Sequence, residues 1–308
     1  MRWYRFGTDS FVCDCEKRKM YWMNIQFFGK KQAGKDVPKM CRRINQWFLK
    51  HLPMIKLTPR LQSAVDYVRP GHLFADVGTD HAYLPIYLCQ TGRLTPVPVS
   101  DGSRLCALAS DINQGPVDRA AAHVATAGLS DCIRTLRTDG LSGLDVYRPT
   151  DIAIFGMGGE LMVSILEAAP WTRSPAVRLI LQPMTHPEKV RAFLLGTGFT
   201  LVGETLSREG QRIYQTLCAC GSAADSLPVR PESLSPAGLL TGFSYPESQR
   251  PLHLSLIDRQ LSSAATRRKA RAMAGQDVSG EDALLEDLQR LRAAVAAGLS
   301  HGNVPTPL

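Results

Sequence analysis

Aspartate and glycine residues follow several short apolar runs of the sequence, at positions from which they could bind a small polar ligand. Asp76 and Gly78 follow the first run, Asp111 follows the second, and Asp139 stands before Gly140 after the third. A carboxylate can accept two hydrogen bonds at once, and glycine lets a ligand approach the backbone closely. A single aspartate at such a position is as often a helix cap, so it is the repetition that indicates a binding site.

Two further apolar runs end in small or polar residues. Gly156-Met-Gly-Gly159 follows the fourth run, and Gln182 stands beside Pro183 after the fifth. The glycines either let a substrate come close to the backbone or form a tight turn between a strand and a helix. Five run ends of the same character predict one shared site for a ligand and its reaction partner.

The apolar runs have the length and spacing of strands that alternate with helices. We expect seven strands, at 73–77, 105–110, 132–137, 151–155, 177–181, 199–206 and 212–219. We expect helices at 58–69, 82–91, 115–128, 161–167 and 187–195, and a surface loop at 95–103. The last two strands are joined by so few residues that they must pair antiparallel. This is the plan of a doubly wound, Rossmann-like α/β sheet whose last strand is antiparallel, which binds ligands at the carboxyl ends of its strands.

A nicotinamide cofactor fits this edge poorly. It favours G-x-G-x-x-G after the first strand and an acidic residue about 20 positions later. This chain has only Gly78 there, and Asp111 lies 33 residues further on. A strand that meets a helix through Gly78 still leaves backbone N–H groups and the positive end of the helix dipole for an anionic group of another cofactor.

S-adenosylmethionine fits the same edge better. Asp111 is placed to accept hydrogen bonds from both ribose hydroxyls. Asp139 could accept the adenine amino protons beside the backbone of Gly140. Asp76 and Asp80 would put negative charge near the cationic sulfonium and ammonium groups. We therefore expect S-adenosylmethionine as the cofactor.

Five blocks around these strand ends are more specific than a generic cofactor loop. They are Asp76-Val-Gly-Thr-Asp-His-Ala-Tyr-Leu-Pro85, Ala109-Ser-Asp-Ile-Asn-Gln-Gly-Pro116, Thr138-Asp-Gly-Leu141, Phe155-Gly-Met-Gly-Gly159 and Leu179-Ile-Leu-Gln-Pro183. Over residues 57–220 the chain resembles the bacterial tRNA adenine-22 N1-methyltransferases, which have the class I methyltransferase sheet. The resemblance implies S-adenosylmethionine as methyl donor, tRNA as substrate, and a coiled-coil-like C-terminal domain that assists tRNA binding.

The expected site has a cofactor side and a catalytic side. The cofactor side comprises Asp76, Gly78, Thr79, Asp80, His81, Asp111, Ile112, Asp139, Gly140 and Gly156. The catalytic side comprises His81, Gly156, Met157, Gly158, Gln182 and Pro183, as positioning residues. Because N1 of adenine is neutral and carries a lone pair, alignment and desolvation can replace a strong base. The Asn/Asp-Pro-Pro-aromatic motif of exocyclic amino methylases is accordingly absent.

Several side chains near this site keep two interpretations. His81 is either a proton relay or a structural residue of the turn. Tyr83 and Tyr214 either stack on a flipped base or belong to the core. Gln182 could donate to or accept from the base edge.

The net charge of +8 comes from the N-terminus. Residues 1–56 hold 13 Lys and Arg against 4 Asp and Glu, which leaves a net charge of −1 for residues 57–308. The first 53 residues are either an extension of uncertain order, with Met54 as the real start, or a basic, aromatic RNA-binding arm. In the body, the basic run 267–271 is either a solvated helix face or a contact to the RNA backbone.

Three domains are expected: the extension at 1–53, an S-adenosylmethionine-binding methyltransferase domain at 54–225, and a helical domain at 226–308. Apolar spacing in the last predicts an antiparallel helical pair around 275–280. The eight cysteines show no zinc-site spacing, so we expect no metal and reduced thiols in a cytoplasmic protein. We also expect a monomer. No apolar run approaches the roughly 20 residues of a membrane span.

Rival functions are a methyltransferase acting on another RNA position or a small molecule, and a non-catalytic RNA-binding protein of the same fold. The intact set Asp76, Gly78, Asp111 and Asp139 disfavours the last, since a protein without turnover has no need of it.

Overall fold

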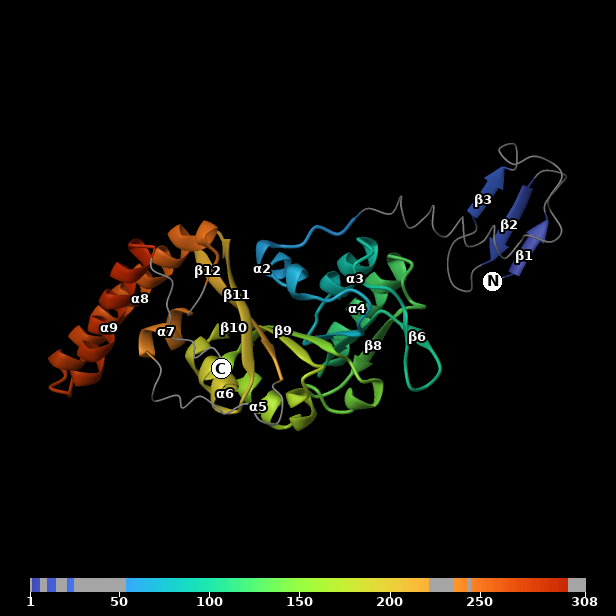
Figure 1. Ribbon diagram of the computed structural model, residues 1–308. Helices are drawn as coiled ribbons and strands as arrows, with labels where there is room; N and C mark the ends of the chain where they lie inside the picture. Colours follow the sequence, from blue (N-terminus) through green and yellow to red (C-terminus); the bar gives the residue numbers. More distant parts are fainter. Residues whose placement is uncertain are drawn as a thin grey trace. The chain divides into compact units, whose positions relative to one another are not determined.

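The computed structural model describes residues 54–221, 235–242 and 245–298, together with the backbone of three N-terminal strands (Figure 1). These strands are β1 (Arg2–Arg5), β2 (Ser10–Asp14) and β3 (Tyr21–Asn24), paired antiparallel in that order. They are rich in aromatic residues, which favour strands. The chain divides into two units, 1–52 and 53–308. The other residues of the expected extension lie outside the described part, and its role and true start stay predictions.

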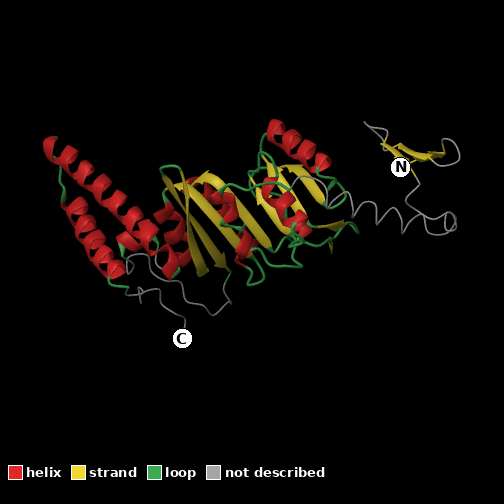
Figure 2. Cartoon of the chain, turned by 90° about the horizontal axis from the view of Figure 1, so that it is seen from above, coloured by secondary structure: helices red, strands yellow, loops and turns green. Residues whose placement is uncertain are grey.

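The second unit contains a seven-stranded sheet in the order β11-β12-β10-β9-β4-β7-β8 (Figure 2). The strands are β4 (Phe74–Val77), β7 (Ala107–Asp111), β8 (Ile133–Arg137), β9 (Asp151–Gly158), β10 (Arg178–Thr185), β11 (Thr200–Glu209) and β12 (Arg212–Cys220). The pairs from β8 to β10 are parallel, and β12 runs antiparallel to both β10 and β11. Parallel strands covered on both faces need the continuous apolar runs seen in the sequence. The predicted fold class is confirmed.

Helices cover both faces of this sheet. On one face lie α3 (Tyr83–Gln90) and α4 (Gln114–Thr126), whose Ile86 and Val124 are buried in one apolar cluster. On the other lie α5 (Gly159–Glu167) and α6 (Pro187–Gly196), whose Met162 and Leu194 are buried in a second cluster. The central strands are thus covered on both sides, which holds their carboxyl ends in place.

Three local expectations were wrong. The helix expected at 58–69 is split into α2 (Pro59–Gln62) and a 3-10 turn η2 (Val65–Tyr67). Between them the Ser63 hydroxyl lies 2.6 Å from that of Thr216 on β12, so a tertiary contact interrupts the helix. The expected loop at 95–103 carries a small hairpin of β5 (Val97–Pro98) and β6 (Arg104–Leu105). Strands β9 and β10 also run three and four residues past their predicted ends, with register shifts near Pro183.

The C-terminal part is helical, with α7 (Pro236–Thr241), α8 (Arg250–Met273) and α9 (Ser279–Ala296). The pair α8 and α9 lies beside the β11–β12 end of the sheet (Figure 1). Short 3-10 turns occur at η3 (Asp145–Tyr147), η4 (Pro170–Arg173) and η6 (Glu247–Gln249). Residues 222–234 lie outside the described part, so the domain boundary at 225 stays a prediction. No helix among the described residues is long and apolar enough to cross a membrane.

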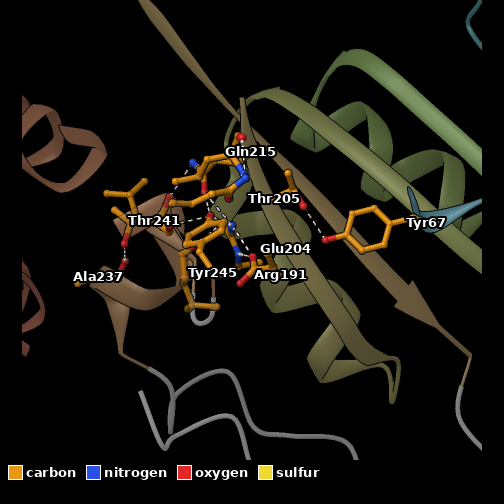
Figure 3. A network of polar contacts seen from close by, with 12 residues as sticks. Tyr67, Arg191, Glu204, Thr205, Gln215, Ala237, Thr241 and Tyr245 are labelled. Atoms are coloured by element: carbon orange, nitrogen blue, oxygen red, sulfur yellow. Dashed lines mark hydrogen bonds and ion pairs between the residues drawn. The ribbon is translucent and has the colours of Figure 1, made fainter. Parts of the chain in front are cut away.

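A buried polar network joins the sheet to these helices (Figure 3). The Arg191 guanidinium of α6 donates 2.7 Å hydrogen bonds to the Glu204 carboxylate, the Gln215 amide oxygen and the Leu239 carbonyl of α7. The Gln215 amide N–H group donates to the Leu240 carbonyl, also on α7. The side chains of Arg191 and Glu204 are 0% and 3% exposed. Strands β11 and β12 are therefore tied to α7 through charged groups shielded from water.

Candidate functional site

The turn from β4 to α3 is held in a specific shape at the carboxyl edge of the sheet. The N–H groups of Gly78 and Thr79 both donate to the Ser110 carbonyl, at 2.8 and 2.9 Å. The Thr79 hydroxyl accepts from the Ala82 N–H at 3.0 Å, and Ala82 has a φ of 55°, rare for a residue with a side chain. Strained backbone of this kind accumulates at functional sites. Thr79 thus shapes the turn with both its backbone and its side chain.

Gly78 has a backbone conformation that favours glycine. Its φ is +75°, and a Cβ at this position would lie 2.0 Å from the Met157 methyl carbon at the end of β9. The first and fourth strand ends are therefore in close contact across the site.

Asp76 is a buried carboxyl group that lacks a cationic partner. It is 6% exposed, and it forms no salt bridge with the described residues. Burial raises its pKa from 3.8 to about 6, against the opposing effect of a hydrogen bond from Thr79. A ligand cation beside it would stabilise the ionised form. The expected cofactor carries two such cations, so this orphaned carboxyl group fits it.

Asp111 and Asp139 are brought together at the ends of β7 and β8. The Thr138 N–H donates to the Asp111 carbonyl at 3.0 Å. One Asp111 carboxylate oxygen accepts from the Asn113 N–H at 2.8 Å, as a turn cap does, whereas the other has no hydrogen bond within the described residues. Asp139 is exposed, and Ile112, which follows Asp111 in the chain, is 52% exposed. An acceptor pair next to an exposed apolar side chain suits a ribose and a planar base.

Asp80 and His81 are engaged with protein groups. The Asp80 carboxylate accepts from the Arg119 guanidinium and lies 3.1 Å from the His81 ring. That ring stacks on Tyr83 at 4.9 Å and contacts His123 at 5.0 Å. These contacts favour a structural role for His81 and Tyr83, and leave Asp76 as the uncompensated charge at this turn.

The glycines after β9 differ in role. A Cβ on Gly159 would lie 2.3 Å from the His186 carbonyl oxygen, so Gly159 is required where two turns pack together. Gly158 faces the Thr185 hydroxyl, at 3.2 Å from its ideal Cβ. Gly156, in contrast, is exposed, has a φ of +79°, and would place a Cβ 3.1 Å from the Arg60 guanidinium. Of these three, only Gly156 is exposed, and it lies beside Arg60 on the catalytic side.

Gln182 is fully buried, and its side-chain amide is satisfied inside the protein. The oxygen accepts from the Arg60 guanidinium at 3.1 Å, and the N–H group donates to the Pro183 carbonyl at 2.9 Å. The Arg60 guanidinium also lies 5.7 Å from the centre of the Tyr214 ring. Gln182 therefore holds Arg60 in position, and Arg60 rather than Gln182 is available at the site.

Arg60 was not predicted as a site residue from the sequence. It lies on the short helix α2, and its contacts are 122 and 154 positions away along the chain. Neither its neighbours nor its spacing marks it, because only tertiary folding brings α2 to the ends of β9, β10 and β12.

A groove of about 910 Å³ adjoins this side of the site. Strand ends of β10 and β12 form one wall, and helices α7, α8 and α9 form the other. It combines apolar with cationic side chains, among them Met184, Tyr214, Arg212, Arg259 and Arg267. Its volume is that of a pocket for a nucleotide-sized ligand.

The predicted site residues thus fall on one edge of the sheet, at two connected places. Asp76, Gly78, Asp111, Ile112, Asp139 and Gly140 surround the ends of β4, β7 and β8, whereas Gly156, Met157, Gln182 and Pro183 surround those of β9 and β10.

Known proteins share this sequence and fold. Residues 57–217 match the family described as a methyltransferase domain. The chain is 33% identical over 221 residues to the tRNA (adenine(22)-N(1))-methyltransferase of Bacillus subtilis (strain 168), with 68% of this chain and 88% of that protein covered.

Solved structures are similar over most of their length. The crystal structure of the B. subtilis m1A22 tRNA methyltransferase TrmK has a TM-score of 0.59 at 26% identity and covers 79% of this chain and 99% of that one. A Streptococcus pneumoniae protein crystallised in complex with S-adenosyl-L-methionine shares the fold, with a TM-score of 0.62 at 24% identity over 77% of this chain and 100% of that one.

Proposed function

This chain belongs to the methyltransferase-domain family and, within it, to the tRNA (adenine(22)-N(1))-methyltransferases, and from that premise we propose that it methylates N1 of adenine 22 in tRNA. The observation that carries the proposal is the shared carboxyl edge, where a cofactor side at β4, β7 and β8 meets a substrate side at β9, β10 and the groove. We further propose that the protein acts in the cytoplasm, because its relative acts on tRNA and the five described cysteines are all free. The monomeric state stays a prediction.

S-adenosyl-L-methionine supplies an electrophilic methyl group when bound. Asp111 would accept hydrogen bonds from the ribose hydroxyls, with Ile112 against the adenine and Asp139 at its amino group. Asp76 would lie at the methionine ammonium, and Gly78 would let the methionine part approach the backbone. These roles agree with the free carboxylate oxygen of Asp111 and the unpaired carboxyl group of Asp76.

The substrate side of the site needs only to align N1 of adenine, which is nucleophilic without a base. Gly156 and Met157 would leave room for the target base beside the cofactor, and Tyr214 would stack on it. Arg60, fixed by Gln182 and Tyr214, would contact a neighbouring phosphate. Within this arrangement Gln182 and Pro183 act as positioning residues.

The groove would receive the tRNA backbone. The basic run on α8 divides: Arg268 and Arg271 form ion pairs with Asp282 and Glu281 of α9, whereas Arg267 lines the groove together with Arg259. Neither Arg259 nor Arg267 forms an ion pair with the described residues. The unpaired arginines are the ones expected to contact phosphates.

We predict that changing both Arg259 and Arg267 to alanine weakens tRNA binding about tenfold or more at moderate salt and reduces the salt dependence of the affinity by about two phosphate contacts. Binding of S-adenosyl-L-methionine should not change. Changing both Arg268 and Arg271 to alanine is the matched control, since it removes two charges from the same helix and should leave the tRNA affinity within about twofold. Filter binding across a salt series measures both. An equal loss in the control would contradict the groove assignment.

The reaction itself is tested by methyl transfer from labelled S-adenosyl-L-methionine to a tRNA transcript with A at position 22 and to one with G there. The protein is used from Met1 and from Met54. We expect label on N1 of A22 alone, and equal rates from both proteins if the first 53 residues are dispensable. Cofactor binding without transfer to either transcript would show that this tRNA is not the substrate. Transfer to both transcripts would show that A22 is not the methylated position.

The pKa of Asp76 predicts how cofactor binding depends on pH. Only the ionised carboxylate attracts the methionine ammonium, so the affinity should rise up to about tenfold per pH unit below pH 6 and level off above it. In the free protein the sign is opposite: neutral Asp76 is the better buried form, so its stabilising contribution is present below pH 3.8 and is lost as the pH rises through about 6.

Calorimetric titration between pH 5 and pH 8 tests this prediction. Asp76→Asn should bind S-adenosyl-L-methionine weakly at every pH. Its free energy of unfolding at pH 7 should be up to about 3 kcal/mol higher than that of the unmodified protein. An Asp76→Asn protein with unchanged pH dependence would show that another group controls binding.

A further inference from the structure

Three cysteine thiols meet at the amino-terminal edge of the sheet, opposite the site described above. Cys89 lies in the last turn of α3, Cys106 directly precedes β7, and Cys132 directly precedes β8. Their sulfur atoms all lie within 4.8 Å of one another. Cys106 is buried, the other two are half-buried, and none forms a disulfide. Three soft ligands from three separate elements therefore converge at one point.

The backbone around the thiols is fixed by hydrogen bonds. The Cys106 N–H donates to the Cys132 carbonyl at 2.7 Å, and the Cys132 N–H donates to the Leu129 carbonyl at 3.0 Å. The thiols belong to the apolar cluster that contains Leu129 and Ile133. In the part of the chain that the structure describes, this is the one group of three or more Cys, His, Asp or Glu whose ligand atoms converge in this way.

The separation suits a tetrahedral metal ion. With a Zn–S bond of about 2.3 Å, two sulfur ligands of one zinc ion lie about 3.8 Å apart. Thiols within 4.8 Å need to move together by about 1 Å at most. The half-buried Cys89 and Cys132 leave an entry path for the ion.

A bound cation favours the ionised form of the thiols that coordinate it. Each thiol that becomes a ligand releases its proton to solvent.

We propose that Cys89, Cys106 and Cys132 form a zinc site of three thiolates, with water as the fourth ligand. The ion would tie the ends of α3, β7 and β8 together. The opposite ends of the same elements carry the Gly78 turn, Asp111 and Asp139. The site would therefore stabilise the elements that present the cofactor residues, at a distance from the reaction itself.

The sequence conceals this site because its ligands stand 17 and 26 positions apart and carry no C-x-x-C pair. The three cysteines come together only in the folded protein, where the starts of β7 and β8 lie beside the end of α3.

The test uses the reduced full-length protein, stripped of metal with a chelator and titrated with Co²⁺ and then with Zn²⁺. We expect thiolate-to-cobalt charge-transfer absorption together with tetrahedral visible bands, saturating at one ion per chain and lost when zinc displaces cobalt. Zinc should also raise the midpoint of thermal unfolding. In the variant with all three cysteines changed to serine, the absorption and the thermal shift should both be absent.

Two further variants keep the result interpretable. Cys89→Ser, at a half-buried position, should weaken metal binding about tenfold or more while S-adenosyl-L-methionine still binds, which reports a folded protein. Cys220→Ser, a half-buried free thiol on β12, should bind metal like the unmodified chain. Cys13, Cys15 and Cys41 are present in every variant and contribute an equal background. Absence of the absorption in folded unmodified protein, or equal uptake by the triple variant, would overturn the proposal.

Discussion

Replacing Arg191 by methionine is expected to lower the free energy of unfolding by about 3–5 kcal/mol. Methionine retains much of the apolar volume but removes the guanidinium. The Glu204 carboxylate, 3% exposed, would then lose its cation inside the protein, and the Gln215 amide oxygen and the Leu239 carbonyl would lose their donor. The cost of leaving a buried charge uncompensated exceeds the net value of the ion pair itself. Urea unfolding followed by circular dichroism measures the change.

Arg292→Met is the matched control on the same chain. Arg292 pairs with Asp258 between α8 and α9 at 2.6 Å, but both side chains are about half exposed, so its loss should cost at most about 1 kcal/mol. Adding Glu204→Leu to Arg191→Met should recover part of the lost stability, because it removes the buried carboxylate that has lost the Arg191 guanidinium. Equal effects of the two single variants would show that Glu204 is compensated by other groups or by water.

The network matters for function because Arg191 and Gln215 both reach backbone carbonyls of α7. Helix α7 lines the groove together with α8. A loosened α7 would therefore weaken tRNA binding more than cofactor binding, since Asp76 and Asp111 lie on strands outside the network.

The sheet could be predicted from the sequence because its strands are marked by residues within them and directly after them. The central parallel strands β4, β7, β9 and β10 are largely buried, so each appears as an apolar run, whereas the edge strand β8 is only partly buried. Each of the five ends in a residue that a ligand edge requires. Asp76, Asp111 and Gly156 could be assigned to one edge for the same reason, without knowledge of their contacts. The short connection between β11 and β12 dictates their antiparallel pairing.

Contacts between distant parts of the chain could not be predicted. Asp80 looks like Asp76 in the sequence, but Arg119, 39 positions later, neutralises it. Gln182 looks like a ligand at a strand end, yet Arg60 occupies its amide oxygen. Helix α7, six residues long, is too short to show a period and is held by its contacts to α6 and α9. Pairing of charges and docking of short elements depend on tertiary structure, which local patterns do not contain.

Asp111→Ala is expected to weaken binding of S-adenosyl-L-methionine by about 100-fold or more. Two hydrogen bonds from ribose hydroxyls to a carboxylate would be lost, each worth about 1.5–3 kcal/mol. The half-buried side chain makes a single hydrogen bond within the described residues, from the Asn113 N–H, so the free energy of unfolding should fall by about 1 kcal/mol or less. Isothermal titration calorimetry with S-adenosyl-L-methionine and urea unfolding of the same samples separate the two effects.

Two control variants isolate the ribose contact from the turn. Asp111→Asn keeps an oxygen that can accept from the Asn113 N–H but loses the charge, so its affinity should lie between those of the alanine variant and the unmodified protein. Asp118→Ala removes an exposed carboxylate from the next helix, where it accepts from Gln114 at 2.8 Å, and should leave the affinity unchanged. If Asp111→Ala bound the cofactor normally, the ribose would lie elsewhere on this edge, even if the protein still methylated tRNA. Equal losses from Asp111→Ala and Asp118→Ala would instead indicate a general effect of charge on a cationic ligand.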